Sequence, residues 1–161
     1  MAWDRASATT CGRLSQARVA AGTVDGERLV GMQLDLIYLD DYKSEPSVLF
    51  SGEAMPLLEF AKMLRSLPTG RAKKLHLEPL FNCHSIESLE LAIEKNSLGM
   101  RQIKPANFRW VISREAAGLY AHLVEALAQS QSAAHQYLDL ENSKQIQIVV
   151  SKGEYPSGYF T

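Results

Sequence analysis

The chain has 161 residues, of which 46% are hydrophobic and 22% charged, and its formal net charge is -1. This composition is typical of a soluble globular domain, and a nearly neutral chain has no field to attract nucleic acid or an anionic membrane. No apolar run approaches the about 20 residues of a membrane-spanning helix. The cysteines, Cys11 and Cys83, make no disulfide framework, so we expect a reducing, cytoplasmic compartment.

Residues 1–28 differ in composition from the rest of the chain. Their first part is rich in Ala, Ser and Thr, with arginines and a single acid, Asp4. Organellar transit peptides have this composition, and so does an N-terminal tail or short helix. We expect the tail or short helix, followed by a single domain over residues 29–161.

Two stretches of the chain resemble each other. Residues 47–67 read SVLFSGEAMPLLEFAKMLRSL and residues 110–127 read WVISREAAGLYAHLVEAL, so Phe50 lies over Ile112. Past these stretches, residues 90–96 resemble residues 147–153, which places Ile93 over Val150. The alternative is chance similarity between two segments of strand followed by helix.

The resemblance predicts two units of strand, strand, helix, strand, strand, at about residues 31–97 and 98–153. Two copies are too few for a solenoid, which needs at least about three stacked units. We therefore predict an α+β fold in which a mostly antiparallel sheet, built from two ββαββ pseudo-repeats, has both helices on one face.

The first unit begins with a strand over residues 32–39 and a short buried strand over residues 48–50. Ser51 is predicted to cap a helix that ends before Pro68. Alternation of apolar and polar residues predicts strands over residues 73–78 and 88–94, joined by a loop over residues 79–85.

The second unit repeats this order. A strand over residues 108–113 ends at Ser113, which is predicted to cap a helix with Glu115 in its first turn. Its apolar stripe is predicted to consist of Leu119, Tyr120, Leu123 and Leu127. Strands follow over residues 136–140 and 145–151.

Strict alternation implies that one face of the sheet is buried and the other is exposed to water. The side chains predicted on the exposed face are His76, Glu78, Glu90, Glu94, Asp139 and Gln147. Because this set leans acidic, we interpret the face as a docking surface for a basic or polar protein partner, where complementary charge governs association rate and specificity.

A second group of residues is dense in potential ligands: His76, Glu78, Cys83 and His84. Histidine, carboxylate and thiolate can bind zinc, and a cysteine beside a histidine can act as a nucleophile. Their spacing matches no known metal motif, and no phosphate-binding glycine loop is present. We therefore expect no catalytic residue, metal or cofactor, and keep an enzyme or a small-ligand or metal-binding domain as the alternative.

The segment LHLEPLFNCHSIESLELAIEK, residues 75–95, resembles small bacterial immunity proteins of polymorphic toxin systems. In that family an LxLxP strand end is followed by a short loop and an SLxLxI strand. The resemblance covers about residues 46–96. It implies a cytoplasmic α+β protein that binds and neutralises a cognate toxin, and it transfers no individual site residue.

These observations together predict a non-enzymatic protein-binding module of the immunity type, with a protein partner and neither a nucleic-acid nor a membrane partner. A third class is a purely structural homo-oligomer, such as a homo-dimer joined through exposed sheet edges.

Overall fold

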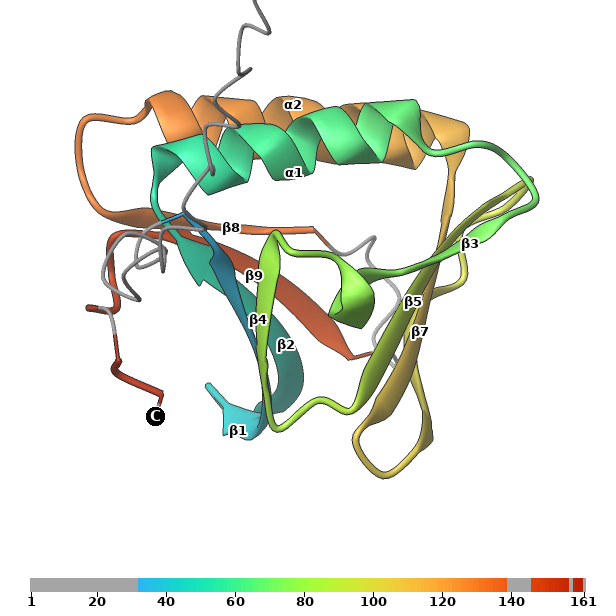
Figure 1. Ribbon diagram of the computed structural model, residues 1–161, viewed down its shortest axis with the longest axis horizontal. Helices are drawn as coiled ribbons and strands as arrows, with labels where there is room; N and C mark the ends of the chain where they lie inside the picture. The colour runs from blue at the N-terminus through green and yellow to red at the C-terminus, as the bar shows by residue number, and fades with distance from the viewer. Residues whose placement is uncertain (1–31, 139–145, 157, 161) are drawn as a thin grey trace, which may run out of the picture.

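The computed structural model describes residues 32–138, 146–156 and 158–160, which contain two helices and nine strands. The predicted α+β class, dominated by sheet, is confirmed (Figure 1). The elements are β1 Leu34–Tyr42, β2 Glu45–Gly52, α1 Ala54–Ser66, β3 Ala72–Lys74, the 3-10 helix η2 Leu75–Leu77, β4 Phe81–His84, β5 Ser88–Glu94, β6 Gly99–Lys104, β7 Asn107–Ser113, α2 Arg114–Gln129, β8 Ala134–Tyr137 and β9 Gln147–Lys152.

The strands form two mixed sheets where the sequence predicted one mostly antiparallel sheet. The five-stranded sheet has the order β4-β1-β2-β9-β8 and the four-stranded sheet the order β3-β5-β7-β6. Three of the pairings are parallel, namely β1 with β4, β2 with β9, and β5 with β7. Parallel partners lie far apart in sequence, so local alternation does not reveal them.

The last strand of each predicted unit joins the sheet that contains the first strands of the other unit. β9 pairs with β2, and β5 pairs with β7, both in parallel. The registers correspond, because Phe50 pairs with Val150 while Ile112 pairs with Ile93, the residues that the sequence alignment matches. This correspondence supports the duplication, which itself stays a prediction.

Both helices lie side by side over one end of the two sheets, and the core fills the space that the three layers enclose (Figure 1). Phe60 of α1 stacks on Phe50 of β2 with ring centroids 4.9 Å apart. The Phe81 ring meets the Phe60 ring edge-on at 5.7 Å, and Trp110 of β7 stacks with Tyr120 of α2. Both predicted units therefore contribute aromatic rings to one core.

Caps distinguish the two helices. The Ala116 N–H donates to Ser113 Oγ at 3.1 Å, and Glu115 lies in the first turn, so the predicted cap of α2 is confirmed. The predicted cap of α1 is wrong, because β2 continues through Ser51 and the N-cap position falls on Glu53, whose side chain makes no capping hydrogen bond.

Three further predictions fail locally. The strand predicted over residues 73–78 stops at Lys74, and the chain turns into η2, with Leu75 buried and Leu77 exposed, because the Glu78 N–H bonds the Leu75 carbonyl. The loop predicted over residues 79–85 contains β4. On α2, Leu119 is exposed and the small residues Ala117 and Ala121 are buried.

Candidate functional site

Of the six side chains predicted to share one exposed face, the five that the structure describes lie in different parts of the molecule. Glu90 and Glu94 lie on β5 of the four-stranded sheet, whereas Gln147 lies on β9 of the five-stranded sheet. His76 belongs to η2 and Glu78 follows it. Asp139 lies outside the described residues. Of the predicted docking residues, the structure therefore places only Glu90 and Glu94 on the same sheet face.

That face is the side of the four-stranded sheet turned away from the core. Leu89, Leu91 and Ile93 of β5 are buried in the core, so the alternating residues Glu90 and Glu94 point outward. The same alternation places Arg109 of β7 outside, between the core residues Phe108 and Trp110.

Charged side chains cross this face in a single row. In the register of the sheet, Lys74 of β3 lies beside Glu90, and Glu90 lies beside Arg109. Arg109 in turn lies beside Arg101 of β6, so each strand contributes one charged residue to the row. Arg109 also forms an ion pair with Glu94 at 3.4 Å, with both side chains about 40% exposed. We call Lys74, Glu90, Glu94, Arg101 and Arg109 the charged sheet face.

This surface carries charges of both signs, whereas the sequence suggested a mainly acidic face. Local alternation identified its two glutamates, but their cationic neighbours come from other strands through the pairings. Beside the charged row lies a row of small side chains from the same strands, Ala72, Ala92 and Val111, aligned with Gly99. The surface therefore presents charges of both signs, while Ala92 and Val111 of the neighbouring row are covered, with exposed fractions of 3% and 1%.

A shallow cavity of about 250 Å³ adjoins the charged sheet face near the β6–β7 turn. Glu90 and Arg109 line it from the charged row, and Ile103 of β6, which is 62% exposed, lines it from the edge. This corner places an exposed apolar side chain beside charged neighbours.

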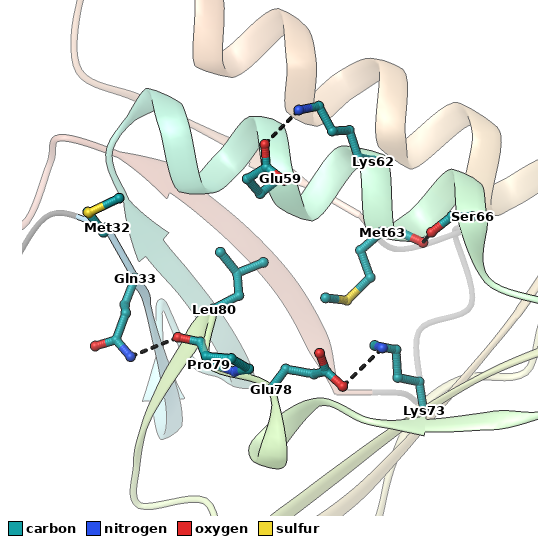
Figure 2. A pocket seen from close by; sticks show the side chains of 10 residues that line it. All are labelled: Met32, Gln33, Glu59, Lys62, Met63, Ser66, Lys73, Glu78, Pro79 and Leu80. Atoms are coloured by element: carbon teal, nitrogen blue, oxygen red, sulfur yellow. Dashed lines mark hydrogen bonds and ion pairs between the residues drawn. The ribbon is translucent and has the colours of Figure 1, made fainter. Parts of the chain in front are cut away.

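His76 and Glu78 have structural partners elsewhere. The Leu89 N–H donates to His76 Nδ1 at 3.2 Å, which ties η2 to β5. Glu78 forms an ion pair with Lys73 at 2.9 Å, on the rim of a groove between α1 and the segment that leads into β4 (Figure 2).

The groove encloses about 590 Å³. Figure 2 shows Met63 of α1 and Leu80 facing each other across it, with the Glu59–Lys62 and Lys73–Glu78 ion pairs at its margins. Its lining residues are Met32, Gln33, Glu59, Lys62, Met63, Ser66, Lys73, Glu78, Pro79 and Leu80. The charged residues that line the groove form ion pairs with one another. The groove therefore has an apolar floor, and none of its lining charges is left unpaired to orient a ligand.

Cys83 and His84 do not form a nucleophile–base pair. They are successive residues of β4, and Cys83 packs against the core, where burial raises the pKa of its thiol. His84 points to the other face, and its Nε2 lies 2.8 Å from Asp35 Oδ1 of β1. The cluster on which the enzyme or metal alternative rested, His76, Glu78, Cys83 and His84, is therefore divided among four environments.

The outward face of the five-stranded sheet holds polar residues that the sequence analysis did not single out. Asp35 lies beside Asn82 on one side of the sheet and beside Ser51 on the other, and Ser51 pairs with Ser151. At the far edge, Glu154 accepts a hydrogen bond from Ser151 Oγ at 2.6 Å. Its other carboxylate oxygen lies 2.9 Å from His135 Nδ1. Local sequence could not reveal the Asp35–Asn82 and Ser51–Ser151 neighbours, because they depend on parallel pairings.

Aromatic side chains cover another part of this face. Tyr42, Tyr137 and Tyr155 pack over a small second core of Ile37, Leu49 and Val149. Burial, and to a smaller extent the hydrogen bond between the Tyr42 and Tyr155 hydroxyls, raises the pKa of Tyr42 to about 12. The strand faces beneath these rings are therefore not free for a partner, in contrast to the charged sheet face.

Searches of protein-family models, curated proteins and solved structures found no match to the chain. In the part of the chain that the structure describes, no group of three or more His, Cys, Asp or Glu side chains is arranged to hold a metal ion. None of the helices there is long and apolar enough to cross a bilayer.

Proposed function

We propose that the protein is a non-enzymatic protein-binding module of the immunity type, which binds and neutralises a toxin through the charged sheet face. The observation that supports this proposal most is the row of charges from Lys74 through Glu90 and Arg109 to Arg101, one from each strand of the sheet. A rigid sheet fixes the spacing of these charges, so a partner with the complementary pattern is selected over others.

The direction of charge complementarity follows from the same row. Glu90 lies between two cations, and Arg101 and Lys74 lie at the outer strands. A partner that matches the row presents a basic residue at the centre, opposite Glu90, with acidic residues on both sides of it. This pattern is more specific than the basic or polar partner that the acidic lean of the sequence suggested.

The test is capture of a partner from extracts of the native host by tagged protein, with capture by charge-reversed variants alongside. We expect the Glu90→Lys, Arg109→Glu double variant to lose the partner, because it inverts two adjacent charges and leaves the net charge unchanged. The matched control, Glu59→Lys with Lys62→Glu, inverts an exposed ion pair on α1 and is expected to retain it.

The captured protein identifies the function. A partner that arrests growth when produced alone, and whose arrest is relieved by the wild-type chain but not by the Glu90→Lys, Arg109→Glu variant, supports the immunity role. A partner bound equally by wild type and variant contradicts the proposed face.

A further inference from the structure

We propose that Asp35, Asn82 and His84 form a binding site for a divalent transition-metal ion at the edge of the five-stranded sheet. The side chains come from two strands that pair in parallel, with Asp35 of β1 directly beside Asn82 of β4 and His84 two residues further along. The site lies on a different sheet from the charged sheet face and does not depend on the proposed function.

The separations within this trio match the face of an octahedron. Asp35 Oδ1 lies 2.8 Å from His84 Nε2 and 2.9 Å from Asn82 Nδ2, and Asn82 Nδ2 lies 3.1 Å from His84 Nε2. Ligands bound at right angles with metal–ligand distances of about 2.0–2.2 Å are about 2.8–3.1 Å apart. An ion can therefore bind all three groups with little movement of the strands.

Without an ion, the Asn82 amide N–H donates to Asp35, and His84 Nε2 lies within hydrogen-bond distance of both side chains, of which it can bond only one at a time. Rotating that amide by half a turn brings its carbonyl oxygen toward the other two ligands, since the amide oxygen and nitrogen occupy nearly equivalent positions. Two oxygens then face each other, which a cation stabilises and which is unfavourable in its absence. The orientation of the Asn82 amide therefore depends on whether an ion is bound.

The ligand types select the metal. One imidazole nitrogen, one carboxylate and one amide oxygen suit ions such as cobalt, nickel and zinc, whereas calcium and magnesium prefer oxygen-only sets. Both the Asp35 and His84 side chains are partly exposed, at 30% and 20%, so water can fill the remaining coordination positions.

The experiment is isothermal titration of the tag-free full-length protein with cobalt chloride, followed by nickel chloride. We expect saturable one-to-one binding by the wild type, with an affinity that falls about tenfold or more in His84→Ala and in Asp35→Asn. The matched control is His135→Ala, which removes the histidine of the other described His–carboxylate pair and is expected to leave the affinity unchanged.

A gain-of-affinity variant keeps the test independent of folding defects. Asn82→Asp supplies a second carboxylate, so we expect cobalt to bind more tightly than to the wild type. The absence of saturable cobalt and nickel binding overturns the proposal. So does binding that His135→Ala removes, or binding that His84→Ala and Asn82→Asp both leave unchanged. Far-UV circular dichroism of each variant verifies that it is folded.

Discussion

Replacing Phe60 with alanine tests whether the two predicted units share a single cooperative core. The ring is fully buried on α1, stacked on Phe50, and in edge contact with Phe81 of the same unit. It also lies 6.5 Å from the Trp110 ring, which belongs to the other unit. Removing it deletes contacts on both sides of the boundary between the units.

The expected loss follows from these contacts. Truncating a buried phenylalanine to alanine costs about 3–5 kcal/mol, through lost burial and the cavity left behind. The lost stacking on Phe50 places the cost toward the upper end of this range, since aromatic pairs contribute about 0.5–1.5 kcal/mol beyond their burial. For a chain of this size a loss of about 4–5 kcal/mol lowers the melting temperature by roughly 8–20 °C.

The assay is urea unfolding followed by circular dichroism and tryptophan fluorescence. Two controls flank the variant: Phe60→Leu, expected to cost about 1.5 kcal/mol or less, and Lys62→Ala on the exposed face of α1, expected to cost about 0.5 kcal/mol or less. A cost below about 1.5 kcal/mol for Phe60→Ala, or two separate unfolding transitions, would refute the shared core.

Three further predictions concern single groups. Ser113→Ala removes the cap of α2 and should lower the free energy of unfolding by about 1 kcal/mol in a urea titration. The pKa of Tyr42 is raised from 10.0 to about 12 in the folded chain, so as pH rises the unfolded state loses this proton at a lower pH than the folded state does. Stability should therefore fall as pH rises from 10.0 to about 12, and ultraviolet titration of Tyr155→Phe should show a lower pKa for Tyr42. In a Cys11→Ser background, Cys83 should react with a thiol reagent much more slowly in the folded protein than in urea, because it is half-buried and its thiol pKa is raised.

Where the structural signal is local, the sequence was sufficient to predict it. Alternation located β5 over residues 88–94 with its observed ends, and the serine at Ser113 located the start of α2, although the same kind of signal at Ser51 misplaced the start of α1. Glu90 and Glu94 were placed correctly on an outward face because period-two alternation within one strand determines it.

What the sequence could not supply depends on long-range pairing. The acidic reading of the exposed face failed because Arg109, 19 positions after Glu90, lies beside it only through the parallel pairing of β5 and β7. The neighbours of His84 were missed for the same reason, since Asp35 is 49 positions away and β4 lay in a predicted loop. Over residues 75–77, where alternation favoured a strand, the chain forms the 3-10 helix η2, which buries Leu75 in the core.

The most direct test of the central claim is the association rate of the captured partner with the wild type and with the Glu90→Lys, Arg109→Glu variant, measured by surface plasmon resonance. If the partner docks on the charged sheet face, the variant should bind about tenfold or more weakly, and the wild-type association rate should fall as salt is added. Equal affinity and equal association rates for both proteins would contradict the account and place the interface elsewhere on the molecule.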